Sequence, residues 1–445
     1  MMKIKRFPVK HLGAISSFLA IALALAVGCD KKAAGPEIRI GVIQAQTGTY
    51  AAFGTGALFG VQAAVEDINK LGGVKVGNEH CPIRMVVVDS QSDPSKLEAL
   101  ADRLITQDKV HFLVKGNEPT PMHAGISQAA ERHRIPFITS VGPYEPWLGQ
   151  KKEARSDWNH TWATGAFAIS TPAAPGDSRA KPGYTIMDTW VTMLEIFGEF
   201  TNRQIGIVVM DDPAGRGWYN LFAPALQNMG YTVAGADRHL GWVSPGTKDF
   251  STIIKGMKDA KVDILWGNLP SPVFGAFWKQ ASELGFKPQM VSIGRAATEY
   301  SDIASWGGDL PQGIGTDMAW DPSMVNSPGF GETTPRSLAD RWAKATGQPV
   351  NRGIGSGYRS VQVLVDAIQR AASVEPAKVN AALAATDLPT ICHQVKFNDQ
   401  HFSHSPLFFG QWMKTDKPEK WELRIIFSWH PAAAENAKPL FPLPR

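Results

Sequence analysis

Short apolar runs rich in β-branched residues alternate with amphipathic stretches along most of the chain. The first run covers residues 38–44, a glycine-rich turn follows at 47–56, and apolar residues then recur at helical spacing from 57 to 71. Buried strands that alternate with amphipathic helices build parallel sheets covered on both faces. The pattern therefore predicts an α/β fold made of doubly wound parallel sheets.

The alternation falls into two blocks, separated by residues 171–185, which are rich in Pro, Gly and Ser. The predicted strands of the two blocks are 38–44, 83–89, 112–114, 136–139, 204–210, 231–236, 263–266 and 289–293. The predicted helices are 57–71, 94–107, 121–134, 189–200, 218–229, 250–259 and 274–285, and then 359–372 and 376–384. Strands at 394–397 and 421–427 close the body. A body of more than 400 residues exceeds what one hydrophobic core supports, so two domains are expected.

The first thirty residues combine a basic start, an apolar run from about residue 12 to 27 and small residues before Cys29. This pattern predicts an export signal over residues 1–28 and a polar tether over 29–37. The junction resembles the lipobox of bacterial lipoproteins, although Ala26 stands where that family usually has Leu. The resemblance implies a lipid on Cys29 and a periplasmic, membrane-anchored protein. A plain cleaved signal and an uncleaved anchor are the other readings.

Charge gives no support to nucleic-acid binding. The chain has 45 Lys and Arg against 41 Asp and Glu, and four of the basic residues lie in the first 28, so the remainder has 41 of each. The basic balance thus belongs to the signal segment. Without Cys29, two cysteines remain, Cys81 and Cys392, and an oxidising compartment permits a disulfide between them without requiring one.

An enzyme would need a nucleophile or a metal constellation, and the usual motifs are absent from the sequence. There is no HExxH, no Walker-type loop and no CxxC. Cys392 and His393 with His401 and His404 match no established zinc spacing. We therefore expect no catalysis, no cofactor and no metal, and keep a metal-dependent enzyme as a distant alternative.

A series of short motifs in a set order resembles one known family. They are Gln46-Thr47-Gly48, Phe53-Gly54, Glu66-Asp67-Ile68-Asn69, Gly72-Gly73, Asp89 to Pro94, Ile135 to Ile138, Lys248 to Ser251 and Gly357-Tyr358. Their order and spacing resemble the leucine-binding-protein-like periplasmic proteins of branched-chain amino-acid ABC transporters, over nearly all of residues 38–430. The resemblance implies a type I binding protein, whose two α/β lobes close on a ligand and then meet the transporter's membrane subunits.

The family pattern also implies where the lobes begin and end. Three crossover strands are expected near Trp162, Thr316 and Lys396. The N-terminal lobe would then comprise 38–162 and 317–395, the C-terminal lobe 163–316 and 396–430, and residues 431–445 a Pro-rich tail. A monomer is expected.

In amino-acid binders of this family, strand-end backbone NH groups and hydroxyls receive the ligand carboxylate, and a glutamate receives the ammonium. Here Gly294-Arg295 stands where that glutamate belongs, and Glu118 lies at or near a serine of the carboxylate loop. These departures argue against an ordinary leucine-type ligand. An arginine fork suits a ligand carboxylate, and aromatic residues could stack on a flat ligand. Those candidates are Tyr144, Trp147, Trp218, Trp266 and Trp320.

The ligand contacts that the resemblance implies are Thr47, Gly48, Asn117, Glu118, Ser140, Gly142, Arg216, Asn268 and Arg295. Two roles stay open for Glu118: it receives an ammonium or amide of the ligand, or it pairs with Arg295 in the closed form. The expected function is delivery of a small organic ligand, either an amino acid or an aromatic or other carboxylic acid, to an ABC importer. The alternative is a ligand-sensing lipoprotein that addresses a membrane receptor.

Overall fold

The computed structural model describes residues 36–154, 156–169 and 182–444. The expected signal segment, Cys29 and most of the predicted tether lie outside the described residues, as does most of the 171–185 break. Within the described ranges, no helix is both long and apolar enough to cross a bilayer.

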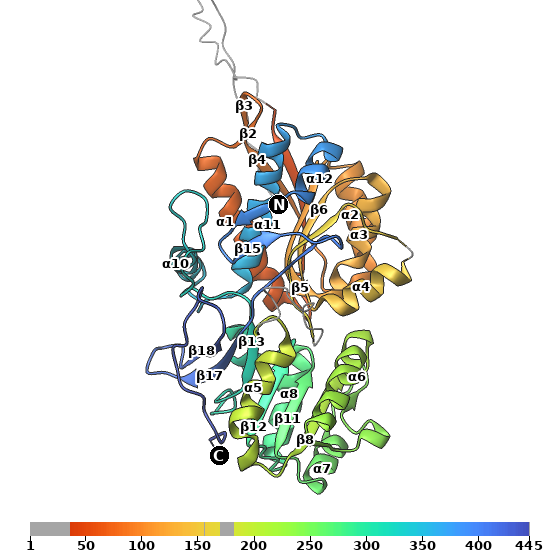
Figure 1. Cartoon of the computed structure of the whole chain (residues 1–445), viewed down its shortest axis with the longest axis vertical. Helices are drawn as coiled ribbons and strands as arrows, with labels where there is room; N and C mark the ends of the chain where they lie inside the picture. The colour runs from red at the N-terminus through yellow and green to blue at the C-terminus, as the bar shows by residue number, and fades with distance from the viewer. Residues whose placement is uncertain (1–35, 155, 170–181, 445) are drawn as a thin grey trace, which may run out of the picture. The chain divides into compact units, whose positions relative to one another are not determined.

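The first sheet has six strands in the order β16-β7-β6-β5-β1-β4, and all of its pairings are parallel. Its strands are β1 (Ile38–Gln44), β4 (Ile83–Asp89), β5 (Phe112–Pro119), β6 (Phe137–Gly142), β7 (Thr161–Ala166) and β16 (Phe402–His404). The helices around it are α1 (Ala51–Lys70), α2 (Leu97–Thr106), α3 (Ala124–His133), α4 (Tyr144–Glu153), α11 (Gly353–Ala371) and α12 (Pro376–Ala384). Helices α1 and α11 pack on one face and α2 and α3 on the other, as Figure 1 shows.

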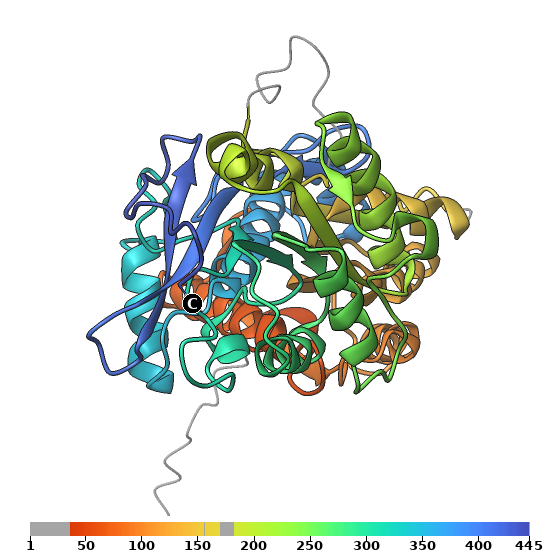
Figure 2. The same cartoon turned by 90° about the horizontal axis from the view of Figure 1, so that it is seen from below.

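The second sheet has the order β10-β8-β11-β12-β13-β17-β18, with β9 beside β8. Its strands are β8 (Gln204–Met210), β9 (Thr232–Val233), β10 (Trp242–Val243), β11 (Ile264–Asn268), β12 (Met290–Gly294), β13 (Gly315–Met318), β17 (Phe408–Lys414) and β18 (Trp421–Ser428). The helices of this part are α5 (Ile186–Phe197), α6 (Pro213–Asn228), α7 (Ser251–Asp259), α8 (Ser271–Glu283) and α9 (Tyr300–Ile303). The sheet is parallel up to β13, whereas β17 and β18 add antiparallel strands at its edge (Figure 2).

Smaller elements complete the described chain. Helix α10 (Pro335–Thr346) packs against α11, and two hairpins are formed by β2 (Val74–Val76) with β3 (Glu79–Cys81) and by β14 (Asp387–Pro389) with β15 (Gln394–Lys396). Single 3₁₀ turns are η1 (Pro94–Lys96), η2 (Thr120–Met122), η3 (Gly198–Phe200) and η4 (Ala236–Arg238).

The predicted fold class is confirmed: helices cover two largely parallel sheets. The chain passes between the sheets three times, after β7, after β13 and between β16 and β17. We propose that the two sheets define the two lobes. The last boundary then lies after His404 and not near Lys396, because β16 still pairs with β7 of the first sheet.

The first helix begins earlier than the sequence pattern predicted. Residues 47–56 were expected to form a turn, yet α1 begins at Ala51 and includes Gly54. A Cβ atom on Gly54 would lie 1.8 Å from the carbonyl oxygen of Ala45, so this glycine permits close packing of a helix and does not mark a turn. The unpredicted elements include α4, α10 and β17, whereas β7 contains Trp162, near which a crossover strand was expected.

The disulfide that the sequence left open is not formed. Cys81 and Cys392 are both free and buried. Cys81 lies in the β2–β3 hairpin, whereas Cys392 follows β14 and lies beside Arg359 of α11. Each thiol therefore has packing surroundings of its own.

Candidate functional site

A cavity lies where strands of both sheets end. The carboxyl ends of β5 and β6 contribute Asn117 and Ser140, and the ends of β11 and β12 contribute Asn268 and Arg295. Helix α11 and strand β13 supply further lining residues. Open parallel sheets bind ligands beyond the carboxyl ends of their strands, so this cavity is the candidate binding site.

Arg359 is the most informative residue of the cavity. Its residue exposure is 2%, and it extends from α11 to the cavity wall. Nη2 donates to the Ser140 hydroxyl at 2.7 Å, Nη1 donates to Nδ1 of His393 at 3.0 Å, and Nε donates to the Thr164 hydroxyl at 3.2 Å. Nη1 also donates to the Ser405 hydroxyl at 3.4 Å. All four acceptors are neutral groups, because burial holds the pKa of His393 well below its usual value.

No carboxylate within the described part of the chain forms an ion pair with Arg359. The ion pairs among the described residues pair ten other arginines with acids, and none includes Arg359. Burial lowers the pKa of this guanidinium, although an arginine stays charged in proteins. A buried charge is normally paired. A negatively charged ligand could therefore supply the anion that the guanidinium of Arg359 lacks.

Strand β7 makes room for this guanidinium at Gly165. A Cβ atom at that position would lie 2.2 Å from Nη2 of Arg359. The thiol of Cys392 also lies beside the guanidinium, and burial raises the pKa of Cys392 to about 11, so it remains a neutral thiol. The site is thus built around a positive charge with neutral neighbours.

Arg295, the arginine expected at the site, does line the cavity. Its Nη1 donates to Oδ2 of Asp212 at 3.0 Å and to Oδ1 of Asn268 at 3.3 Å, and Nη2 donates to the Tyr50 hydroxyl at 2.8 Å. Burial opposes its charge, but Tyr50 and Asp212 raise the pKa of Arg295. Arg295 therefore already has an acid partner, and its contact with ligand stays a prediction.

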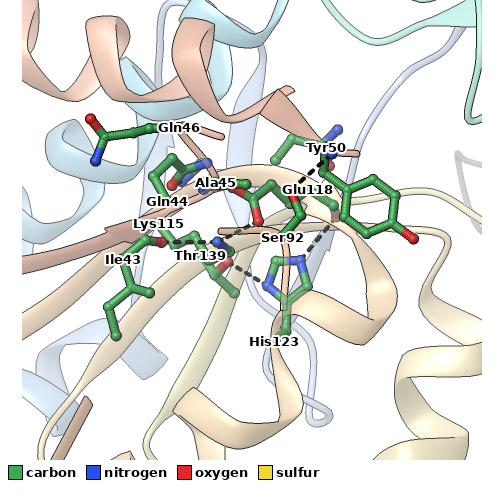
Figure 3. A network of polar contacts seen from close by, with 12 residues as sticks. Ile43, Gln44, Ala45, Gln46, Tyr50, Ser92, Lys115, Glu118, His123 and Thr139 are labelled. Atoms are coloured by element: carbon green, nitrogen blue, oxygen red, sulfur yellow. Dashed lines mark hydrogen bonds and ion pairs between the residues drawn. The ribbon is translucent and has the colours of Figure 1, made fainter. Parts of the chain in front are cut away.

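Glu118 also lines the cavity, but its carboxylate is held inside the first lobe (Figure 3). Lys115 donates to its Oε2 at 2.7 Å, and the backbone NH of Ala45 donates to its Oε1 at 2.7 Å. Both charged side chains are 0% exposed. Burial lowers the pKa of Lys115 and raises the pKa of Glu118. Of the two roles left open for Glu118, the pairing with Arg295 is not found.

A buried histidine extends the same network. Nε2 of His123 donates to the backbone oxygen of Glu118 at 3.0 Å, and its Nδ1 lies 3.0 Å from the Thr139 hydroxyl. Burial lowers the pKa of His123 to about 3, so the ring is neutral at ordinary pH. The network holds β5 where its register with β6 shifts between Val114 and Asn117.

The structure brings six of the nine expected contacts to the cavity wall and leaves three outside. The six are Asn117, Glu118, Ser140, Gly142, Asn268 and Arg295. Thr47 donates its hydroxyl to Asp89 at 2.7 Å, and Gly48, with φ of +86°, shapes the adjacent turn. Arg216 pairs with Asp211 at 2.7 Å and is exposed. Thr47 and Gly48 thus shape a turn outside the wall, and Arg216 lies on the exposed side of α6.

Two of the five expected aromatic residues, Trp218 and Trp320, line the cavity, together with Phe53 and Phe167. Tyr144 and Trp147 instead pack around Phe402 in a separate cluster of the first lobe, and Trp266 packs against Trp190. Part of the cavity lining is thus aromatic, and two of these residues, Phe53 and Phe167, were not among the five expected aromatic contacts.

Two acidic side chains lie on the β13 and α9 side of the cavity. Glu299 accepts the backbone NH of Arg352 at 2.7 Å, and burial raises the pKa of Glu299 to about 8. Burial also raises the pKa of Asp317 to about 6. The cavity lining therefore combines a cationic group on α11 with acidic groups from β13 and from the residue before α9.

Comparisons with known proteins agree with this architecture. A family model described as periplasmic binding protein matches residues 37–417. The Leu/Ile/Val-binding protein BraC3 of Rhizobium johnstonii is 24% identical over 366 residues, which cover 82% of this chain and 88% of the relative. The Leu/Ile/Val-binding protein of Escherichia coli is 22% identical over 383 residues, covering 85% and 92%.

Solved structures share the fold. A leucine-binding protein from Thermotoga maritima matches with a TM-score of 0.67 at 18% identity, covering 88% of this chain and 99% of that one. A Rhodopseudomonas palustris BisB5 solute-binding protein in complex with 3,4-dihydroxybenzoic acid matches with a TM-score of 0.66 at 17% identity, covering 90% and 98%. The family model spans most of the chain, so the resemblance read from the motifs is confirmed: this chain belongs to the periplasmic binding proteins, in their branched-chain amino-acid type.

Proposed function

We propose that this chain is an extracytoplasmic solute-binding protein that delivers a small organic carboxylate to an ABC importer. Membership of the periplasmic binding protein family supports the transport role. The single observation that carries the ligand class is Arg359, a buried guanidinium in the cavity wall whose hydrogen-bond acceptors are all neutral.

A carboxylate is the anion that best fits this position. A carboxylate oxygen accepts a hydrogen bond from a guanidinium NH, and such charge-assisted bonds are stronger than neutral ones. The ligand charge would also remove the penalty of an unpaired buried cation. Among the residues that the structure describes, no acid pairs with Arg359, so none of them competes with the ligand.

The aromatic wall favours a flat ligand body. Trp218, Trp320, Phe53 and Phe167 line the same cavity as Arg359. Two similar structures hold 4-hydroxybenzoate and 3,4-dihydroxybenzoic acid, whereas the relatives of the Leu/Ile/Val group are named for aliphatic amino acids. We therefore place aromatic and other organic acids ahead of leucine-type amino acids for this chain.

Closure of the lobes is part of the proposal. The Arg295–Tyr50 hydrogen bond joins a loop of the second sheet to the residue before α1, and so supports a closed state. We further propose that the protein acts as a monomer, is held to the membrane through a lipid on Cys29, and presents the closed form to the importer's membrane subunits.

A thermal-shift panel of acids and their matched amides tests the ligand class. Benzoate, 4-hydroxybenzoate, leucine and phenylalanine would be compared with benzamide and 4-hydroxybenzamide. A ligand at a hundredfold excess over its dissociation constant stabilises the folded state by about 2.7 kcal/mol. Shifts with aromatic acids and none with their amides support the proposal. A benzamide shift equal to that of benzoate would refute the carboxylate assignment.

A further inference from the structure

Asp317 is an acid of the cavity wall without a partner. Among the described residues, its side chain forms neither an ion pair nor a hydrogen bond with another residue, and its pKa is affected only by burial and by its own backbone NH. The other acids of this wall differ. Glu118 is paired with Lys115, and Glu299 accepts the NH of Arg352.

Strand β13, which carries Asp317, is paired with β12 only at the first residue of the strand. This residue is Gly315, opposite Ser292, while the other edge of β13 stays paired with β17 up to Met318. Beyond Gly315, one side of the strand is therefore free of sheet hydrogen bonds. Thr316 is buried. Asp317, which is half-buried, lines the cavity together with the buried Met318.

Such a position is unfavourable for the protein alone. Burial raises the pKa of Asp317 to about 6, which means that the charged form is poorly solvated there. A partly desolvated carboxylate without a donor from another residue destabilises a fold, whereas a hydrogen bond from a ligand restores part of the lost solvation. Its place in the binding cavity, without a structural partner, points to a role in recognition.

We propose that Asp317 accepts a hydrogen bond from a hydroxyl or amino substituent at the end of the ligand opposite the carboxylate held by Arg359. The ligand class is then hydroxy- or amino-substituted organic acids. This inference rests on the proposed function. Arg359 belongs to a helix packed on the first sheet and Asp317 to a strand of the second, so such a ligand bridges both lobes.

Calorimetric titration of the purified full-length protein with matched acids tests the inference. The probes are 4-hydroxybenzoate and 4-aminobenzoate, which carry a donor, and benzoate and 4-methoxybenzoate, which do not. Because a hydrogen bond to a charged group contributes about 1.5–3 kcal/mol, the wild type should prefer the donor ligands by about tenfold or more. The hydroxyl and amino probes also show which donor is preferred.

Variants of Asp317 test whether this residue causes the preference for acids that carry a donor. In Asp317→Ala the ratio of benzoate to 4-hydroxybenzoate dissociation constants should fall to near one, with benzoate binding retained. The control Asp309→Ala removes an exposed acid, which pairs with Lys414 at 2.9 Å, and should keep the ratio. If Asp317→Ala does not fold, Asp317→Asn replaces it and should lower the ratio.

The outcomes separate the two proposals. Equal wild-type affinity for donor and donor-free acids, or a ratio that Asp317→Ala leaves unchanged, overturns the role of Asp317 while the proposed function stands. If the protein binds matched amides as tightly as these acids, or binds no acid, the carboxylate proposal fails and this inference fails with it.

Discussion

Nη2 of Arg295 donates a hydrogen bond to the hydroxyl of Tyr50 at 2.8 Å, and the guanidinium carbon lies 6.0 Å from the centre of the tyrosine ring. Arg295 follows β12 of the second sheet, and Tyr50 precedes α1, which packs on the first. Its other terminal nitrogen is held by Asp212. This arrangement favours a role for Arg295 in stabilising the closed lobes.

Replacing Tyr50 with Phe tests that role. The change removes one hydrogen bond to a charged group and keeps the ring, so the closed state should lose about 1.5–3 kcal/mol at most. Affinity for every ligand should fall by a similar factor in calorimetric titrations, with the order of preference unchanged. If Arg295→Met instead removes the discrimination between acids and amides, Arg295 contacts the ligand carboxylate.

Replacing Lys115 with Met should destabilise the fold strongly. The variant leaves the carboxylate of Glu118 buried without its cation, and breaking a buried pair in this way costs about 3–5 kcal/mol. The double variant Lys115→Met, Glu118→Gln should be less destabilised than Lys115→Met alone, because no charge remains. Urea unfolding curves measure both, and an equally unstable double variant would contradict this view of the pair.

Gly165→Ala should impair acid binding with little loss of stability elsewhere. The added methyl group would meet Nη2 of Arg359 and move the guanidinium. The matched control is Gly217→Ala in α6, where a Cβ atom would meet nothing within 4 Å. Thermal shifts with 4-hydroxybenzoate should shrink for the first variant and persist for the second. Undiminished binding by Gly165→Ala would show that Arg359 does not need this space.

Stability should fall as the pH rises toward 8, in part because of Glu299. Burial raises the pKa of this carboxyl from 4.5 to about 8, so between these values the folded state binds more protons than the unfolded state. Under that condition the free energy of unfolding decreases with increasing pH. Glu299→Gln should flatten this part of the profile, measured by melting temperature from pH 5 to 8. Identical profiles for variant and wild type would contradict the assignment.

The sequence motifs predicted much of the cavity lining but did not identify Arg359, its buried cationic residue. Strands 38–44 and 204–210 were predicted with the bounds that the structure shows, because continuous apolar runs leave little choice. Arg359 was missed because it was read as the first residue of a helix, whereas α11 begins at Gly353. One signal in the sequence could have identified it. Arg359 stands among apolar residues of the same helix that are buried, such as Ile354, Val361 and Leu364.

Side-chain pairing was beyond the reach of the sequence. Arg295 and Glu118 were placed in the cavity by family position, but position alone did not reveal Asp212 or Lys115 as their partners. Asp212 lies 83 residues before Arg295, and only the folded sheet brings them together. Such contacts depend on three-dimensional packing and not on local pattern.

The account depends most on Arg359 as the receptor of a ligand carboxylate. The most direct measurement is calorimetric titration of the wild type and Arg359→Met with 4-hydroxybenzoate, with melting curves to verify that the variant folds. Because charge-assisted bonds contribute about 1.5–3 kcal/mol, the account predicts that the variant binds at least about tenfold more weakly than the wild type. Equal affinity in a folded variant would contradict it.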